Sequence, residues 1–364
     1  MVRRVDPAEL ARLRAATQLL HRPTAAKEPA AIARSIGGAQ AQDVYAGPQH
    51  FRSRSRTLNA ADIASARTEE RSLLRAWVMR RTVHLIPTDD AGWWLPLFEP
   101  IFEKWSRRRL GQLGMPPGDV AKALRVMGRS LASDGPLTRP ELAGRVVDAG
   151  VELNEQTRLH VIGVAVNSGI ACLGPDRGSQ TCLVLREDWL GRLPRFDREM
   201  ALAELARVYL GAFAPATDRD FAYWAGLPLR DVRSGLESIS REIEEVGVGD
   251  ERMLAPRGGL PRLPRTGQVR MLGNFDTYLL GWADRGFSVS GEHAIHVKEG
   301  GGGWIRPVIV EDGIVVGGWR STRRDGRLEI SLNLPKRERD RLRPKVETEI
   351  ADIERFEGME ARIV

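Results

Sequence analysis

The sequence predicts an α+β protein in which helical units come first and a β-rich module comes last. A pattern of three helical segments followed by strand-like segments recurs three times along the chain. From Met271 onward, short alternating runs are separated by glycine-rich turns, which is typical of strands. A charged segment, Arg337–Phe356, closes the chain and predicts a final helix.

The first round occupies residues 1–115. Apolar residues near helical spacing predict a helix from Pro7 to Leu20. A second helix is expected at Pro29–Ile36, because a glycine pair follows it. A third is expected at Asp62–Arg71, with Asn59 or Thr57 as its cap. The segment Arg75–Pro87 then predicts one strand or two.

The same order returns at residues 116–195 and again at 196–272. Thr138 and Glu141 have the spacing of a capping box at the start of one of these helices. The expected segments are Val120–Ala132, Pro136–Leu142, Gln156–Val166 and the hairpin Ile170–Leu173 with Thr181–Leu185, then Arg198–Ala212, Thr217–Trp224 and Leu229–Glu245. Helices followed by a strand hairpin have the order of a winged-helix domain, so we expect three winged-helix units in tandem.

Residues 273–364 form the β-rich module, which we expect to be a small barrel or curled sheet with a C-terminal helix. Its strands are predicted at Phe287–Ser290, His293–Val297, Trp304–Val310, Gly313–Trp319 and Leu328–Leu334. The run Gly300–Gly303 predicts a turn and lacks the lysine and hydroxyl residue of a phosphate-binding loop. No nucleotide cofactor is therefore expected.

Composition indicates a polyanionic partner. The 55 lysine and arginine residues exceed the 48 acidic residues and give a formal net charge of +7. No apolar run is long enough to span a bilayer and the first residues lack the apolar core of a signal peptide, so we expect a cytoplasmic protein without membrane contact. Cys172 and Cys182 are expected as free thiols, and no residue cluster has the spacing of a metal site.

A polar island, Gln40-Ala41-Gln42-Asp43, is the most informative feature of the first round. Side chains alternate along an extended backbone, so Gln40 and Gln42 point the same way only if this segment is extended. A carboxamide has both donors and an acceptor, so the two together can hold a water or a sugar edge without adding negative charge beside a phosphate. Two solvated loop glutamines are the plain alternative.

Three arginines, Arg52, Arg54 and Arg56, alternate with serines just after the island. If the backbone is extended there, all three lie on one side and could clamp phosphates. The alternative is a solvated charged loop. We favour the phosphate contact because the stretch is close to the two glutamines.

Arg80, Arg81 and His84 lie in the predicted strand segment Arg75–Pro87. A histidine between apolar residues is more often structural than catalytic. Its polar neighbours nevertheless make His84 a candidate for lining a cleft, with the two arginines as contacts to a polyanion.

The segment Arg320–Arg327 links two predicted strands, and Asp325-Gly326 is a strong signal for a tight turn. Arg320, Arg323 and Arg324 could protect the edge of a sheet from pairing with another chain. They could equally enter a narrow DNA groove, which attracts arginine. The sequence leaves these two interpretations equal.

Four separated fragments of the chain resemble the AlkZ-type DNA glycosylases. They are Gln40–Gln42, Arg75–Leu85, Asn274–Arg285 and Val316–Arg320. Their order and spread cover most of the chain, from about Leu10 to about Ile353. Each fragment alone is weakly specific, whereas the ordered set is moderately to strongly specific for the family.

The resemblance implies tandem winged-helix units and a catalytic Gln-apolar-Gln motif, which Gln40, Ala41 and Gln42 match. A related branch carries aspartate at the second position, whereas Asp43 lies one residue out of register here. The resemblance further implies a monofunctional DNA glycosylase that removes bulky alkylated purines, such as N7-alkylguanine adducts of a DNA-damaging natural product, including crosslinks. The expected partner is double-stranded DNA containing alkylated purines, bound by a monomer.

The residues near the island fit a hydrolytic reaction. Lys27 is the one lysine near the glutamines, so a Schiff-base mechanism has no obvious nucleophile. A purine alkylated at N7 is cationic and leaves without a general acid, so the enzyme needs mainly to hold the sugar and position water. A non-enzymatic winged-helix DNA-binding protein or transcriptional regulator is the alternative, and a relative that binds lesions without cutting is a third.

Overall fold

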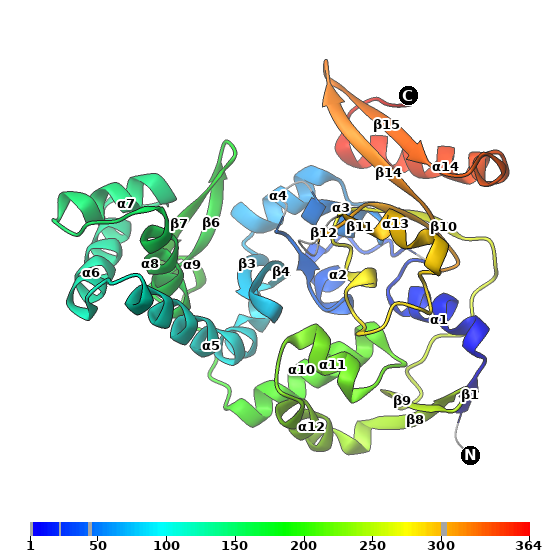
Figure 1. Cartoon of the computed structure of the whole chain (residues 1–364), viewed down its shortest axis with the longest axis horizontal. Helices are drawn as coiled ribbons and strands as arrows, with labels where there is room; N and C mark the ends of the chain where they lie inside the picture. Colours follow the sequence, from blue (N-terminus) through cyan, green and yellow to red (C-terminus); the bar gives the residue numbers. More distant parts are fainter. Residues whose placement is uncertain (1–2, 22, 43–45, 300–303) are drawn as a thin grey trace.

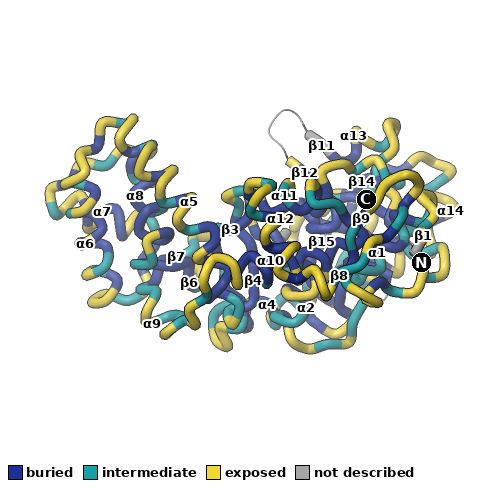
Figure 2. The backbone as a smooth tube through the Cα atoms, turned by 90° about the horizontal axis from the view of Figure 1, so that it is seen from below, coloured by how far each residue is buried: buried dark blue, intermediate teal, exposed yellow. Residues whose placement is uncertain are grey.

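The computed structural model describes all residues except 1–2, 22, 43–45 and 300–303 (Figure 1). The first round, the third round and the β-rich module make up one body, and the second round projects from it as a separate lobe, on the left in Figure 1 and in Figure 2. The long helix α5, Ala91–Gln112, leads from the body into this lobe. No helix in the described part of the chain is both long and apolar enough to cross a membrane.

Each of the three rounds has the order helix, short strand or bridge, helix, helix, strand, strand. The first round consists of α2 Pro29–Ser35, β2 Ala39–Gln40, α3 Ala46–Arg52, α4 Ala60–Thr68, β3 Leu73–Val78 and β4 Thr82–Pro87. The second consists of α6 Pro117–Asp134, β5 Leu137–Thr138, α7 Arg139–Asp148, α8 Glu155–Asn167, β6 Ala171–Arg177 and β7 Gln180–Leu185, followed by α9 Arg186–Leu190. The third consists of α10 Arg198–Phe213, a bridge at Ala216, α11 Asp218–Ala225, α12 Leu229–Ser238, β8 Ile243–Val248 and β9 Glu251–Pro256.

Helices begin where the sequence places capping residues. The side chain of Asn59 accepts from the N–H of Asp62 at the start of α4, and the Asp62 carboxylate accepts in return. The capping box predicted for Thr138 and Glu141 is confirmed at the start of α7.

The first two rounds share one six-stranded sheet with the order β2-β4-β3-β6-β7-β5. The two halves of this sheet meet where Arg75 of β3 pairs with Leu173 of β6. The N-terminal strand β1, Arg3–Val5, instead adds to the sheet of the third round by pairing in parallel with β8. Helix α1, Leu10–Thr17, follows it and buries Leu13 in the core of that round. The N-terminal segment thus belongs spatially with the third round.

The C-terminal module contains a curled five-stranded sheet with the order β10-β13-β14-β15-β16. Its strands are β10 Val269–Leu272, β13 Val308–Glu311, β14 Ile314–Arg324, β15 Arg327–Asn333 and β16 Ala361–Ile363. The predicted terminal helix is confirmed as α14, Lys336–Glu357. It packs on the sheet through a shared core that includes Leu342, Val346 and Ile353.

Two of the strands predicted in this module are wrong. Phe287–Ser290 forms no strand, and Ala294–Val297 is the short helix α13 after a 3-10 turn, Gly291–His293. Adjacent residues His296 and Val297 are both buried while Ile295 is 68% exposed, so burial does not alternate as it would in a half-buried strand. Two-residue strands β11 Lys298–Glu299 and β12 Trp304–Ile305 pair nearby, and Gly300–Gly303 lies outside the described residues.

The helix predicted to reach Glu245 also ends early, at Ser238. The following residues pair instead as the hairpin of β8 and β9, from Ile243 with Pro256 to Val248 with Glu251. The alternating residues at the end of the predicted helix therefore belong to the strand pair of the third round.

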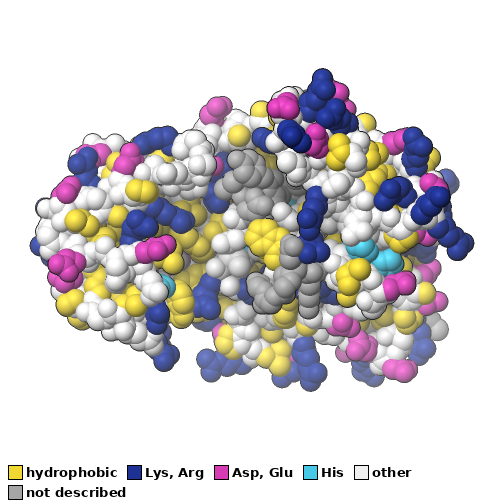
Figure 3. Space-filling model, turned by 45° about the horizontal axis from the view of Figure 1, so that its top comes forward, with side chains coloured by type: hydrophobic (Ala, Val, Ile, Leu, Met, Phe, Trp, Pro, Cys, Tyr) yellow, Lys and Arg dark blue, Asp and Glu magenta, His cyan; other side chains and the backbone are white. Residues whose placement is uncertain are grey.

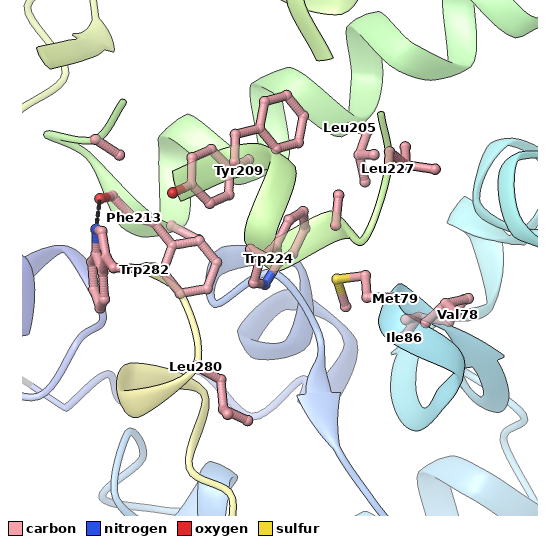
Figure 4. Packing of buried hydrophobic residues seen from close by; sticks show 14 of the residues in the cluster. Val78, Met79, Ile86, Leu205, Tyr209, Phe213, Trp224, Leu227, Leu280 and Trp282 are labelled. Carbon is pink, nitrogen blue, oxygen red and sulfur yellow. Dashed lines mark hydrogen bonds between the residues drawn. The ribbon is translucent and has the colours of Figure 1, made fainter. Parts of the chain in front are cut away.

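An aromatic core joins the third round to the segment Asn274–Arg285 (Figure 4). The indole N–H of Trp282 donates to the carbonyl oxygen of Phe213 at 3.1 Å. The hydroxyl of Tyr209 donates to the carbonyl oxygen of Gly281 at 3.0 Å. Met79, from the turn between β3 and β4, reaches the same cluster, so this core also fixes the position of those two strands.

Candidate active site

Gln40 and Gln42 lie where a short strand crosses the end of β4. Gln40 is the last residue of β2 and pairs with His84 of β4. The N–H of Ala41 donates to the carbonyl oxygen of Val83 at 2.7 Å, and the side-chain oxygen of Gln42 accepts from the N–H of Val83 at 3.2 Å. The predicted extended conformation is confirmed for Gln40, which lies in β2, whereas Gln42 lies at a bend. Asp43 lies outside the described residues.

The two glutamines have different environments. Gln40 is only 5% exposed, and its side-chain oxygen is buried with no hydrogen-bond partner among the described residues. Gln42 is exposed. A buried acceptor left without a donor costs about 1–3 kcal/mol, so the site keeps an unfavourable group that a ligand or water could satisfy.

His84 faces this position from the neighbouring strand and is buried. Its Nδ1 lies 3.1 Å from the carbonyl oxygen of Thr82. Because a carbonyl only accepts, Nδ1 carries the proton and Nε2 is an acceptor. Burial, with Arg80 nearby, lowers the pKa of His84 to about 3, so this imidazole is neutral at physiological pH.

His50, in α3, is a second buried histidine of this region that the sequence did not single out. Its Nε2 lies 3.3 Å from the carbonyl oxygen of Asn274, which leaves Nδ1 as an acceptor, and that atom has no partner among the described residues. Burial lowers the pKa of His50. In the part of the chain that the structure describes, the region of Gln40 therefore offers neutral acceptors, and no carboxylate contacts Gln40 itself.

The predicted phosphate clamp is wrong for Arg52 and Arg54. The backbone there is the end of α3 followed by turns, with the N–H of Arg54 bonded to the carbonyl oxygen of Phe51, and it is not extended. Arg52 is 1% exposed and pairs with Glu349 and Asp352 of α14, each at 3.1 Å. The guanidinium of Arg52 also donates to the carbonyl oxygen of Met271.

Arg54 is fully buried and grips Asp276 with two hydrogen bonds of 2.8 and 2.9 Å. Burial alone would raise the pKa of Asp276, but Arg54 reverses this and holds the pKa below its usual value. Both arginines thus satisfy internal carboxylates and cannot reach DNA. Only Arg56 of the three is exposed and remains a candidate for a phosphate contact.

Arg80 and Arg81 are not in a strand as predicted but form the tight turn between β3 and β4, with φ angles of 51° and 61°. Arg80 donates to the carbonyl oxygen of Trp224 at 2.5 Å and so ties this turn to the third round. Arg81 is exposed, and its guanidinium lies 4.4 Å from the ring centre of Trp105. Arg81 is the better candidate for a contact outside the protein.

Two arginines that the sequence did not single out stand closer to the glutamines. Arg75 of β3 donates to the carbonyl oxygen of Ala41 at 3.2 Å, between Gln40 and Gln42, and to the hydroxyl of Thr181 at 2.6 Å. Arg139 is the first residue of α7, and its buried Nε has no partner among the described residues. The sequence offered a signal for Arg75, because Arg75 begins one of the fragments that resemble the glycosylase family. For Arg139 it offered only the position next to the helix cap Thr138.

Arg75 and Arg139 line one cavity of about 620 Å³ together with Gln42 and Arg158. Burial, with Arg67 nearby, lowers the pKa of Arg75 to about 10, so it stays charged at neutral pH. Burial also lowers the pKa of Arg139. Among the described residues, two acidic groups partly compensate this cluster: Asp176, 3.6 Å from Arg75, and Glu155, which lines the cavity itself. The arrangement can hold an anion beside Gln42.

The hairpin arginines lie elsewhere, on the projecting part of β14 and β15. Asp325 and Gly326 have φ angles of 49° and 76°, which confirms the predicted tight turn. Arg320, Arg323 and Arg324 are exposed, and basic side chains gather on this upper part of the molecule in Figure 3. Arg323 also pairs with Glu357 of α14 at 2.5 Å.

The sheet topology leaves both interpretations of the hairpin open. The outer edge of β15 is covered by β16. Beyond Gly318, however, β14 pairs only with β15 among the described strands. An open edge thus exists for the arginines to protect, and the same projecting strands could enter a groove.

Comparisons with known proteins agree over most of the chain. A family model described as DNA glycosylase AlkZ-like matches residues 33–356. An interstrand DNA cross-link repair glycosylase of Streptomyces sahachiroi is 32% identical over an alignment of 312 residues, and the match covers 79% of this chain and 80% of that protein. The solved structure of Streptomyces sahachiroi DNA glycosylase AlkZ is similar with a TM-score of 0.78 at 26% identity, over 99% of this chain and 100% of that one.

Proposed function

The chain belongs to the AlkZ-like DNA glycosylase family and is a DNA N-glycosylase, a hydrolase of DNA repair, and we propose that it excises bulky alkylated purines through Gln40 and Gln42. The substrates in this proposal are N7-alkylguanine adducts in double-stranded DNA, including the two ends of an interstrand crosslink. The curated relative named above is itself described as a cross-link repair glycosylase. A monomer that acts in the cytoplasm is part of the same proposal.

One observation carries the assignment of the site. The side-chain oxygen of Gln40 is buried without a partner among the described residues, and it lies beside a strand whose His84 is held neutral. A water that donates a hydrogen bond to this oxygen would relieve the unfavourable burial. Gln42 and Arg75 lie at the open side, where a sugar and its phosphates would approach.

The residues support a reaction in which the purine leaves before a strong base is needed. An N7-alkylated purine carries a positive charge, and the electrons of its bond to C1′ neutralise that charge when the bond breaks. Amide oxygens near C1′ stabilise the positive charge that develops on the sugar, which is the interaction that counts in the transition state. The oxygen of the held water then bonds to C1′, and its proton passes to solvent.

The fold that presents this site is, in our proposal, built from three tandem winged-helix units at 1–115, 116–195 and 196–272, followed by the β-rich module at 273–364. The order of elements within each round supports this division. The shared six-stranded sheet brings β4 of the first unit and β6 of the second close together through β3. The cavity beside Gln42 opens between these two units because its lining comes from both.

The test is single-turnover excision from duplexes that carry N7-methylguanine or one bulky N7-alkylguanine, read as strand cleavage by alkali at the abasic site. Gln40→Ala combined with Gln42→Ala should lower the rate by a factor on the order of 10 to 10³ in a folded protein, because these groups act mainly in the transition state. Gln112→Ala, at the exposed end of α5, is the matched control and should keep the full rate.

Two results would contradict the proposal. Full activity of the double variant would remove Gln40 and Gln42 from the mechanism. If the unaltered protein binds the damaged duplex and leaves no abasic site on either lesion, a lesion-binding protein or a regulator is the better description. A regulator would in addition protect one particular sequence from cleavage, whereas a glycosylase would not.

A further inference from the structure

A small apolar hollow lies between α5 and α8, next to the cavity that Gln42 lines. It has a volume of about 170 Å³, and its apolar walls come from Trp77, Phe102, Trp105, Leu159 and Ile162. Trp105 is 46% exposed and Leu159 is 55% exposed, so two large apolar side chains stand at its mouth. Figure 3 shows hydrophobic side chains on the side of the left lobe that faces the centre of the molecule.

The hollow adjoins the cavity that Gln42 lines. It shares four lining residues with the cavity of Gln42: Trp77, Arg139, Leu159 and Ile162. The guanidinium of Arg139 lies 5.7 Å from the ring centre of Trp77, and so sits at the boundary between the two spaces. A molecule whose anionic part occupies the basic cavity can therefore extend an apolar part into the hollow.

Apart from Arg81 and Arg139, the polar groups that line the hollow do not call for a polar ligand. The side-chain amide of Asn167 already donates to the carbonyl oxygen of Gly163 at 2.7 Å. His160 stands edge-on to Trp105 with 5.0 Å between ring centres, and burial lowers its pKa, so it is neutral at physiological pH. Aromatic walls with a guanidinium over Trp105 favour a flat ring system.

Size limits the occupant further. An apolar cavity of about 150 Å³ holds benzene. A hollow of about 170 Å³ that is open at one side therefore suits a group of one or two fused rings and is too small for a whole nucleoside.

We propose that this hollow is a subsite for the flat aromatic substituent of a bulky DNA adduct whose purine is held at Gln40 and Gln42. The inference rests on the proposed function for the position of the purine. It goes further by naming an aromatic substituent as the part of the lesion that the enzyme recognises, and by assigning Trp105 and Leu159 as residues that determine specificity. Burying one ring should favour a matched adduct by a factor on the order of 10.

The experiment compares two duplexes of one sequence, with N7-methylguanine or N7-(2-naphthylmethyl)guanine at the same position. A 2′-fluoro sugar at the lesion keeps the bond intact, so equilibrium affinity is measured without excision. The unaltered protein should bind the naphthylmethyl duplex more tightly, by roughly tenfold. Trp105→Ala should abolish this preference and leave the affinity for the methyl duplex unchanged. Leu159→Asp should also abolish the preference, but because Leu159 lines the cavity of Gln42 as well, its added negative charge should weaken binding to the methyl duplex too.

Val147→Asp is the matched control, because Val147 is 50% exposed on α7 and does not line the hollow. It should keep the preference. The subsite is overturned if the unaltered protein shows no preference, if both variants retain it, or if they weaken binding to both duplexes equally. Failure of the proposed function looks different, since excision of cleavable versions of both lesions would then be absent whatever the affinities show.

Discussion

Two pairs of arginines lie in the region of the polar island, but they have opposite roles. Arg52 and Arg54 are buried and matched by carboxylates of α14 and by Asp276. Arg75 and Arg139 are only partly buried, and each has an Nε without a partner among the described residues. The first pair holds parts of the chain together, and the second leaves positive charge directed toward a cavity.

The difference shows that distant carboxylates decide what an arginine does. Glu349 and Asp276 are more than 200 residues away from the arginines that they bind. A guanidinium that loses its water must gain acceptors, because an unpaired buried charge costs several kcal/mol. The arginines whose acceptors are incomplete are therefore the ones available for phosphate.

The largest expected effect is on the buried pair. Arg54→Ala should lower the free energy of unfolding by about 3–5 kcal/mol, because it leaves Asp276 buried without its ion partner. Urea denaturation followed by circular dichroism measures this change. Arg56→Ala, two residues away and exposed, should change it by less than about 0.5 kcal/mol.

The dependence of stability on acidic pH tests the same ion pair of Arg54 and Asp276. The pKa of Asp276 is lowered in the folded state, so its contribution to stability is present above the unfolded value of about 3.8 and is lost as pH falls through the folded pKa. Asp276→Asn should remove this part of the acid dependence. If Arg54→Ala left stability unchanged at neutral pH, the contrast between the two arginine pairs would be mistaken.

His84 should give the next largest effect, and it acts through pH. Its pKa is lowered to about 3, so below pH 6.5 the unfolded chain binds a proton that the folded chain does not. Between pH 6.5 and pH 5 this should reduce stability by about 2 kcal/mol, and His84→Gln should reduce that loss. Stability measured at pH 7 and pH 5 for both proteins checks it.

The rate of excision should respond differently. A histidine that stays neutral above pH 5 cannot titrate in the pH profile of single-turnover excision. A transition between pH 6 and pH 7 that disappears in His84→Gln would mean that the imidazole works as an acid or base, against this expectation.

The second arginine pair should affect binding more than folding. Arg139→Gln should weaken binding to duplex DNA and reduce the slope of log affinity against log salt by about one unit, because one phosphate contact is lost. Stability should change little, since Arg139 has no ion pair among the described contacts. Binding isotherms at several salt concentrations measure the slope.

Arg145→Gln is the control for Arg139, because Arg145 lies on the same helix and pairs with Asp134 at 2.8 Å. Its salt slope should match that of the unaltered protein. An unchanged slope for Arg139→Gln would remove the cavity beside Gln42 from the DNA path.

The sequence predicted the parts of this molecule that depend on local rules. Capping boxes such as Thr138 with Glu141, the turn at Asp325-Gly326 and the extended conformation at Gln40 all follow from neighbours a few residues apart. The role of Arg54 could not be predicted that way, because its partner Asp276 is set by tertiary packing. The basic cavity was missed for the same reason, since Arg75 and Arg139 meet only after two rounds share one sheet.

The hairpin of β14 and β15 should give the smallest effect on stability and separates its two interpretations. Arg323→Ala with Arg324→Ala removes two exposed charges and the pair with Glu357. The side chain of Glu357 is only 9% exposed but keeps a hydrogen bond from Gln49, so the loss should be about 1 kcal/mol. If the hairpin enters a groove beside the lesion, single-turnover excision from duplex DNA should fall while unfolding is nearly unchanged. A closed pocket must fit snugly around an extruded base. A bulky adduct that is not fully extruded therefore needs support from a part of the protein outside such a pocket, and the hairpin would supply it.

Edge protection predicts the reverse for the same variant. Among the described strands none pairs with the outer edge of β14 beyond Gly318, so losing two charges there should increase aggregation and leave the rate per folded molecule unchanged. Light scattering and the single-turnover rate, measured on one preparation, distinguish the two. Arg139→Gln is the reference variant for both measurements, because losing a true phosphate contact should lower DNA affinity without causing aggregation. A hairpin variant with the normal rate and increased scattering would leave edge protection as the role of these arginines, and the DNA path would then run along the cavity of Arg75 and Arg139 alone.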